Sequence, residues 1–390
     1  MIPISTLLLL LGLALSPFYV FRSGVPQPAD FFFVLFFVVV LARNFSMQKR
    51  LALPRFALVW LVLVLWITCV AVAWALIDRD WSLAFPALFY IFNFLVGLAL
   101  IFTIRRDQRA ANILAFGVMV GLAFSFVGVL IDLGYGDRVT GWFNNPNQLG
   151  YFSLLSMGIL AILAGFRLRS YVVVLGMVFG LVGLLSSASL GAWGGAVFIA
   201  LAYLVANVGN VSFYVRGVIA LLVICSVMWA VDYARDVAII DNMETRIARA
   251  PSKLDGVFEE RRYDRVFAFK QYWLLGAGES HGSEARFGEH TGAEVHSSFG
   301  NLLLSYGVGP FLLFLGMLGY LFIRAPLAVG FVLLGVMFYS LTHMGLRFTY
   351  FWILIAVVWS LHAAPRARYP LVNSKSGAMK RRISIHGEGT

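Results

Sequence analysis

Residues 54–77 have the sequence PRFALVWLVLVLWITCVAVAWALI, in which Arg55 is the only charged side chain. An α-helix rises about 1.5 Å per residue, so about 20 apolar residues cross the ~30 Å hydrocarbon core of a bilayer. Lipid offers no hydrogen-bond partner, so a spanning segment must satisfy its own backbone, and an α-helix does this. This stretch therefore predicts a membrane-spanning helix.

Eleven further apolar runs lie on both sides of this stretch. They cover 2–21, 30–42, 83–104, 111–131, 148–166, 171–190, 191–207, 217–232, 299–323, 327–343 and 348–363. Together the runs predict an all-α integral membrane protein with about twelve transmembrane helices. One long polar interval, residues 233–298, separates two of the runs and predicts a single large loop.

The composition agrees with lipid as the main solvent of the chain. Of the 390 residues, 61% are hydrophobic and 13% are charged, whereas a soluble domain has roughly 25% charged residues. The net charge of +11 does not indicate a nucleic-acid partner, because the basic residues lie mostly in short loops between apolar runs. Cys69 and Cys225 fall inside apolar runs and predict neither a disulfide nor a zinc site.

The basic residues alternate between loops and predict the orientation of the helices. Seventeen of the 30 lysines and arginines fall on one side, whereas the short loops of the other side hold four. The positive-inside rule then places both termini in the cytoplasm. The loop at 233–298 becomes periplasmic, between an N-terminal transmembrane bundle (1–232) and C-terminal transmembrane helices (299–363). Residues 364–390 form a basic cytoplasmic tail that is predicted to be disordered.

Two polar motifs fall at helix ends on the predicted outer side. Residues 141–148, GWFNNPNQ, place Asn145 and Asn147 around a proline that fits the first turn of the next helix. These amides either cap that helix or line a glycan site. Residues 186–191, SSASLG, join two apolar runs, and small hydroxyl residues there allow close helix packing.

A third motif lies in the long loop. Apolar residues recur at helical spacing from Phe258 to Trp273 and predict an amphipathic helix on the outer membrane surface. The same segment carries Arg261, Arg262 and Arg265. These arginines are either solvated side chains of an ordinary interfacial helix or a cluster that binds a diphosphate, since a guanidinium pairs bidentately with phosphate oxygens.

His296 lies where the long loop returns to the membrane. It is either structural or a general base, because a neutral imidazole near pH 7 accepts a proton from a sugar hydroxyl. Arg347 with His343, near the outer end of the last two helices, is a further candidate. A zinc site from His281, His290 and His296 matches no paired-ligand spacing, so no metal is predicted.

Taken together, these features resemble the bacterial O-antigen ligase and O-antigen polymerase family. The resemblance covers the topology of the whole chain and three short motifs in order: Asn145-Pro146-Asn147, Gly276-Ala277-Gly278, and His296 followed by Gly307-Val308-Gly309. It implies glycan transfer on the periplasmic face of the bacterial inner membrane by a multi-pass glycosyltransferase that uses no cofactor and no metal.

The resemblance also implies partners and residue roles. The donor is a glycan linked to undecaprenyl diphosphate, and the acceptor is another glycan or lipid A–core; further partners of such proteins are chain-length regulator or flippase proteins. His296 matches the catalytic base of the ligase branch. Arg262 or Arg265 match its diphosphate-binding arginines, and Arg261 and Arg347 join them as candidates by position. Asn145 and Asn147 are the candidates for lining the glycan or acceptor site.

Alternative functions stay open on the sequence. Leu190 and Ser297 stand where many members of the family carry Arg and Asn, which favours a polymerase over a ligase that joins glycan to lipid A–core. A polysaccharide or lipid flippase is the alternative of another class. A flippase is expected to carry charges along a path through its bundle, and here charged residues are almost absent from the middle of the apolar runs.

Overall fold

The computed structural model describes residues 3–46, 53–107, 109–132, 138–168, 170–212, 261–279, 284–287 and 295–363, with isolated positions at 215, 217, 226, 244, 245, 248 and 258. Within these residues every element is helical, and none is a strand. The prediction of an all-α chain is therefore confirmed for them. Most of the predicted run 217–232, most of the loop 233–298 and the tail 364–390 lie outside the described residues.

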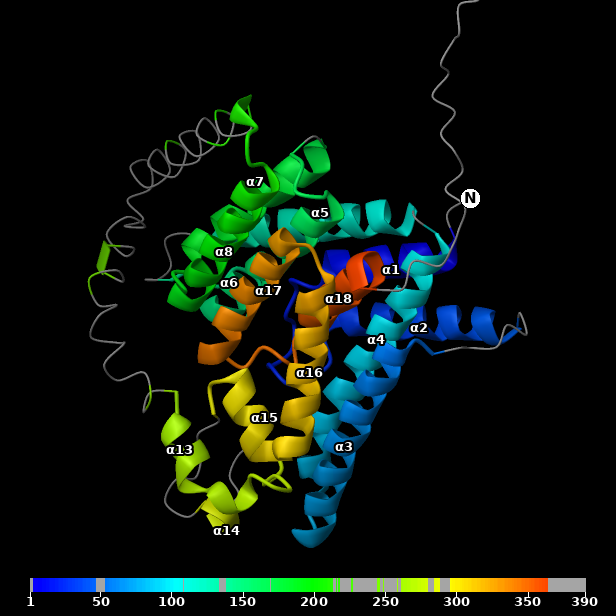
Figure 1. Cartoon of the computed structure of the whole chain (residues 1–390), viewed down its shortest axis with the longest axis vertical. Coiled ribbons are helices and arrows are strands. Elements are labelled where there is room, and N and C mark those ends of the chain that lie inside the picture. Colours follow the sequence, from blue (N-terminus) through cyan, green and yellow to red (C-terminus); the bar gives the residue numbers. More distant parts are fainter. Residues whose placement is uncertain are drawn as a thin grey trace, which may run out of the picture.

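The helices follow the predicted apolar runs. In chain order they are α1 (Ile4–Leu15), α2 (Pro28–Ser46), α3 (Arg55–Ile77), the 3-10 turn η1 (Trp81–Ala84), α4 (Phe85–Arg106), α5 (Arg109–Asp132), α6 (Pro146–Leu163), α7 (Tyr171–Ser186), α8 (Leu190–Ala206), α13 (Tyr263–Ala268), the 3-10 turn η2 (Lys270–Tyr272), α14 (Glu284–Phe287), α15 (Ser298–Tyr306), α16 (Val308–Arg324), α17 (Leu327–Thr342), α18 (Thr349–Val358) and the π-helical turn η4 (Trp359–Ala363). Figure 1 shows α13, α14 and α15 gathered at the lower end of the molecule, near the lower end of α3.

Four helical segments in the described part of the chain are long and apolar enough to cross a membrane: α3, η1 with α4, α5 and α6. Other apolar helices there have 10–17 residues, among them α1, α7, α8, α16 and α17. A straight span needs about 20 residues, with a lower bound of about 17. The apolar helices are typical of a membrane protein, whereas twelve spans and a periplasmic loop stay predictions.

Two helices form the centre of the bundle. α18 is buried from Tyr350 to Val358, and α6 is buried from Leu149 to Ile162. The two helices pack against each other, and α18 also packs against α4. A helix that is apolar and covered all round belongs in the interior of a bundle. The hydroxyl of Tyr339 donates to the carbonyl oxygen of Asn147 at 3.0 Å, so the first turn of α6, with the Asn-Pro-Asn motif, lies beside the end of α17.

α3 has one covered and one uncovered face. Trp60 is fully buried and stacks on Trp352 of α18, with 4.9 Å between ring centroids. On the other face, Leu58, Val62 and Leu65 are 45–52% exposed. A contiguous apolar face of this kind marks a surface that contacts lipid or another protein. The face is consistent with a helix at the lipid boundary.

The predicted run 299–323 is not one helix, which corrects the expectation of a single span there. It forms α15 and α16, which are separated at Gly307 with φ 86° and ψ 179°. Residues with a side chain rarely adopt this conformation. A Cβ atom on Gly307 would also lie 2.5 Å from the carbonyl oxygen of Leu274. The break therefore allows close contact between Gly307 and the loop at Leu274. The apolar pattern of the sequence does not predict this break.

The predicted amphipathic helix from Phe258 to Trp273 is also shorter than expected. Within the described residues, Arg262 adopts a left-handed conformation (φ 60°, ψ 32°), and α13 begins only after it. At Phe269 the backbone leaves the helical region (φ −106°, ψ 47°) before η2 begins. The apolar residues of α13 and η2 pack against α15, and Phe269 and Tyr272 contact Phe287 of α14. Their helical spacing therefore indicates buried side chains in two separate turns and not one continuous helix.

Candidate functional site

Residues from separate parts of the chain meet at the end of α17. Arg138, Arg261 and His296 lie close enough to His343 for their charges to act on it. A guanidinium nitrogen (Nη2) of Arg138 donates a hydrogen bond of 2.8 Å to Oδ1 of Asn147. We call these five residues the histidine site. Its members come from the α5–α6 loop, the first turn of α6, the segment before α13, the segment before α15 and the residue that follows α17.

Aromatic stacking holds His343 in place. Its ring lies 4.5 Å from that of Tyr339, one turn earlier on α17, and Tyr339 stacks on Tyr151 of α6 at 4.1 Å. The Nδ1 atom of His343 is 2.9 Å from the hydroxyl of Thr342. The ring therefore has little rotational freedom, which suits a residue that positions others.

The electrostatic environment keeps His343 neutral. Burial, and then the positive charges of Arg261, His296 and Arg138, lower the pKa of His343 to about 3. Burial acts in this direction because it disfavours the charged imidazolium, and nearby cations add to the effect. A general base works best with a pKa near the working pH. His343 is thus poorly suited to accept a proton from a substrate.

His296 is exposed, in contrast to His343. Its backbone N–H donates to the carbonyl oxygen of Arg261 at 3.2 Å, which ties the start of the loop helix to the end of the loop. The next residue, Ser297, caps α15 through a 3.2 Å hydrogen bond from the N–H of Gly300. Its hydroxyl is also 2.8 Å from that of Tyr263 on α13. The local backbone is thus anchored while the imidazole stays accessible.

Ser298 connects this segment to the end of α17. Its hydroxyl donates to the carbonyl oxygen of His343 at 3.0 Å and accepts from the N–H of Gly345 at 2.8 Å. Its own N–H also donates to the His343 carbonyl, at 3.2 Å. The two histidine segments are therefore joined by their backbones, so the mutual placement of His296 and His343 does not depend on side-chain contacts alone.

The Asn-Pro-Asn motif divides its two amides between different tasks. Asn145 caps α6, since its Oδ1 accepts from the N–H of Gln148 at 3.0 Å. Asn147 accepts from Arg138, whose Nε in turn donates to the carbonyl oxygen of Ser187 at 3.0 Å. The capping interpretation describes Asn145, whereas Asn147 belongs to the histidine site. A role for either amide in lining a glycan stays a prediction.

The SSASLG motif provides close packing, as one interpretation of its small residues expects. A Cβ atom on Gly150 of α6 would lie 2.7 Å from the hydroxyl oxygen of Ser187. A Cβ atom on Gly191 would lie 3.2 Å from the ring of His343. Small residues at these positions let α6, α8 and the histidine site approach one another.

A second polar group surrounds Glu279, which is 3% exposed. Its carboxylate accepts from the amide of Asn301 at 2.7 Å and from the hydroxyl of Tyr306 at 2.6 Å. It also pairs with the guanidinium of Arg347. We call these four residues the carboxylate network. A buried charge with an opposite charge and two hydrogen bonds is a satisfied arrangement.

The two glycine motifs of the sequence meet beside this network. The N–H groups of Ala277 and Gly278 each donate at 2.8 Å to carbonyl oxygens of α15, those of Leu304 and Ser305. A Cβ atom on Gly307 would lie 3.0 Å from the backbone nitrogen of Gly276. The loop turn and the break between α15 and α16 are therefore one contact, in which glycine is needed on both sides.

The predicted arginines end in different places. Arg261 lies in the histidine site, Arg262 is exposed beside it, and Arg347 belongs to the carboxylate network. Arg265 is 5% exposed, with its guanidinium 5.9 Å from the ring centroid of Phe287. The structure therefore brings His296, Arg261 and Asn147 together, and Arg347 forms its described contacts elsewhere. The donor-binding roles of these arginines stay predictions.

Two residues of these sites had no role beyond topology in the sequence pattern. The sequence pattern places Arg138 among the four basic residues of the short outer loops and assigns no role to Glu279. A signal for Glu279 exists, because it directly follows the Gly-Ala-Gly turn. Nothing in the sequence around Arg138 indicates that it reaches Asn147, since the intervening residues 139–146 form a turn with no regular pattern.

Metal ligands do not gather in the part of the chain that the structure describes: no group of three or more His, Cys, Asp or Glu side chains there is placed to hold an ion. His281 and His290, whose spacing with His296 matches no zinc-site pattern, lie outside the described residues.

Comparison with known proteins gives no relative for this chain. No family model matches it, no curated protein matches it, and no solved structure matches it. What can be said of its function depends on its own residues and their arrangement.

Proposed function

We propose that the chain is a membrane glycosyltransferase of the O-antigen ligase/polymerase type. In this proposal it transfers or polymerises a glycan from undecaprenyl diphosphate at the periplasmic face of the inner membrane. The observation that supports it best is the histidine site. There, an exposed histidine, two arginines and an amide from distant parts of the chain converge on one neutral histidine.

The proposed base is His296. Its imidazole takes the proton of the acceptor hydroxyl while that oxygen forms a bond to the anomeric carbon of the donor sugar. The bond between that carbon and the diphosphate oxygen breaks, and the diphosphate leaves with the bonding electrons. His296 suits this role better than His343, because it is exposed to a substrate and His343 has a pKa of about 3.

The proposed diphosphate ligands are Arg138 and Arg261. Both carry positive charge into the histidine site, where the leaving group develops negative charge. Arg347 is less suited than the sequence suggested, since the Glu279 carboxylate already neutralises it and would repel a phosphate. Fixed arginines near the base bring hydroxyl, anomeric carbon and leaving group together, which such a reaction needs.

Within this type, we favour a polymerase, in which the acceptor is another lipid-linked glycan. Many family members carry Asn where this chain has Ser297. Ser297 is fully buried, caps α15 and contacts Tyr263, so it is occupied by a structural task. The ligase, with lipid A–core as acceptor, is the alternative within the type.

A reconstitution assay tests the proposal. The protein is purified, placed in liposomes and supplied with undecaprenyl-diphosphate glycan, and products are resolved by gel. We expect longer glycans from the unaltered protein, and a loss of at least ~10²-fold in rate for His296→Ala, because removal of a general base costs about 10²–10⁴-fold. Arg261→Gln and Arg138→Gln should lower the rate strongly, whereas lysine at either position should restore it in part, since lysine lacks the bidentate fork.

Arg22→Ala is the matched control, because Arg22 is an exposed basic residue on the same predicted side and has no place in the histidine site. It should keep the unaltered rate. If glycan crosses the liposome membrane and no new glycosidic bond forms, the chain is a flippase. A His296→Ala protein that inserts normally and elongates glycan at the full rate would remove His296 from the mechanism.

A further inference from the structure

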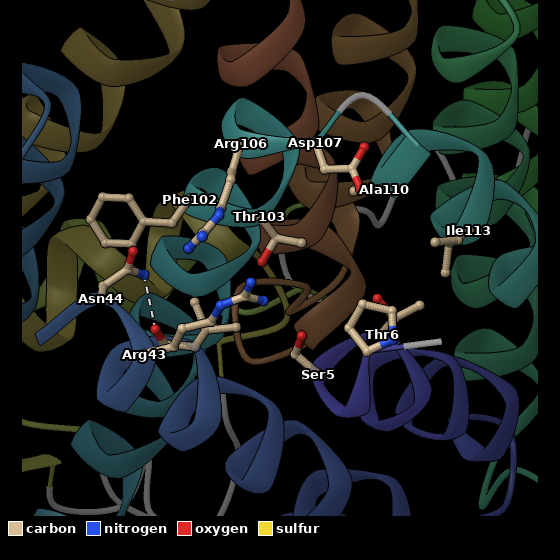
Figure 2. A pocket seen from close by; sticks show the side chains of 12 residues that line it. Ser5, Thr6, Arg43, Asn44, Phe102, Thr103, Arg106, Asp107, Ala110 and Ile113 are labelled. Carbon is tan, nitrogen blue, oxygen red and sulfur yellow. Dashed lines mark hydrogen bonds between the residues drawn. The ribbon is translucent and has the colours of Figure 1, made fainter. Parts of the chain in front are cut away.

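A cavity of about 300 Å³ lies at the other end of the bundle from the histidine site (Figure 2). It is formed where α1 and α5 begin and α2 and α4 end. α5 has 24 residues and runs from this cavity toward the loop that holds Arg138, a distance of about 36 Å for a straight helix. The cavity is therefore separate from the proposed reaction and lies at the predicted cytoplasmic end.

Two guanidinium groups enter the cavity from different helices. Arg43 comes from the last turn of α2 and Arg106 from the last turn of α4. Figure 2 shows both side chains directed into the cavity, near the hydroxyls of Ser5 and Thr103. Two guanidinium groups in one cavity give its lining several N–H donors and positive charge, both of which favour an anion. Guanidinium groups with nearby hydroxyls are the donors that a phosphate prefers.

The lining holds one carboxylate beside these two guanidinium groups, so its side chains carry more positive than negative charge. Asp107 follows α4, and its Oδ1 accepts a 2.8 Å hydrogen bond from the N–H of Arg109 at the start of α5. Figure 2 shows its side chain at the upper rim, away from the guanidinium of Arg43. The positive dipole ends of α1 and α5 and the negative dipole ends of α2 and α4 all face the cavity, so its preference for an anion comes from the two arginines.

The rest of the lining combines apolar side chains with the polar side chains of Thr6 and Asn44. Val40, Phe102 and Ile113 form part of the walls, on helices whose outer faces expose apolar side chains such as Phe31 and Phe116. Polar groups at one end and apolar walls along helices that face lipid match a phospholipid better than a free ion. Basic pockets between transmembrane helices at a membrane surface bind anionic lipid headgroups in this way.

We propose that this cavity binds the phosphate group of an anionic phospholipid, held by Arg43 and Arg106, with the start of its acyl chains along Val40 and Phe102. The inference goes beyond the proposed glycan transfer and does not depend on it. It uses different residues at the opposite end of the bundle.

Native mass spectrometry of the full chain in detergent tests the proposal. The protein is titrated with phosphatidylglycerol or with phosphatidylcholine of the same acyl chains. We expect tighter binding of phosphatidylglycerol. The double substitution R43Q/R106Q should weaken that binding about 30-fold, since each basic residue near a lipid surface contributes about 1 kcal/mol and 1.4 kcal/mol is tenfold.

Arg105→Gln is the matched control. Arg105 is on the same helical turn as Arg106, but its guanidinium lies 5.5 Å from the ring centroid of Trp359 and it does not line the cavity. It should leave phosphatidylglycerol binding unchanged. Equal binding by R43Q/R106Q and the unaltered protein would overturn the proposal, as would an equal loss in Arg105→Gln. A third arm titrates the protein with inorganic phosphate alone: phosphate binding that depends on Arg43 and Arg106, with no binding of phosphatidylglycerol, would show a site for the free ion and refute the lipid assignment.

Discussion

At Glu279, one buried carboxylate joins three segments that lie far apart in the chain. Its partners Asn301 and Tyr306 are on α15, and Arg347 lies between α17 and α18. Glu279 itself closes the loop that precedes α14. Because the side chain is almost fully covered, its charge is stabilised by these partners rather than by water, and each partner in turn depends on it.

Removal of this carboxylate should therefore cost stability. We expect Glu279→Gln to lower the free energy of unfolding by ~3–5 kcal/mol, because it leaves the charge of Arg347 without its carboxylate in a partly buried place. Thermal unfolding of the purified protein in detergent measures the effect. The double variant E279Q/R347Q should lose less than the sum of the two single losses, since the residues interact directly. An unchanged melting temperature for Glu279→Gln would mean that the network carries no stability.

Between elements, the contact of α8 with α17 is the most extensive in the described molecule. It depends on two glycines that face each other: a Cβ atom on Gly195 would lie 2.7 Å from the carbonyl oxygen of Gly335, and the reverse contact is closer still. In lipid, helices gain little from the hydrophobic effect and associate through such close packing. The contact matters for function because α17 ends at His343.

A large side chain at this contact should separate the two helices. We expect Gly335→Leu to lower the free energy of unfolding by at least ~1–3 kcal/mol, the usual cost of overpacking, and to lower the transfer rate because His343 moves. Gly316→Leu on α16 is the control, since no atom lies within 4 Å of a Cβ atom there. The melting temperature, and the transfer rate in the reconstitution assay, are measured for both variants. Equal behaviour of the two variants would contradict a packing role for Gly335.

Across the whole molecule, the two polar ends of the bundle have different proposed functions. The histidine site and the carboxylate network gather at one end with α13 and α15, and the arginine-lined cavity lies at the other. Asymmetry of this kind requires a fixed orientation in the membrane. The positive-inside rule predicts which end faces the cytoplasm.

Cysteine labelling tests this orientation. In a background without Cys69 and Cys225, Gln271→Cys in η2 should react with a membrane-impermeant maleimide in whole cells with a permeable outer membrane. Arg109→Cys at the start of α5 should react only after lysis. Both positions are exposed, so accessibility to the reagent is set by the membrane. The reverse pattern would invert the topology and place the histidine site in the cytoplasm.

Much of the helical framework could be predicted from sequence, because the length of an apolar run can be read from the sequence of that segment alone. The run 54–77 and the helix Arg55–Ile77 agree almost residue for residue, since the backbone of a long apolar segment in lipid has one way to satisfy its hydrogen bonds. The same locality explains the failure at 299–323. An apolar pattern reports burial, and both sides of the Gly307 break are buried, so only the contact with the Leu274 carbonyl decides that the helix ends there.

The sequence by itself also determined which residue types were available at the outer helix ends, among them Asn147, Arg261 and His296. Only the tertiary structure decided their partners. It joined Asn147 to Arg138, put Arg347 beside Glu279, and surrounded His343 with positive charge. The physical reason is distance: electrostatic and hydrogen-bond energies depend on separations of a few ångströms, and those separations follow from which helix ends the packing of the bundle brings together.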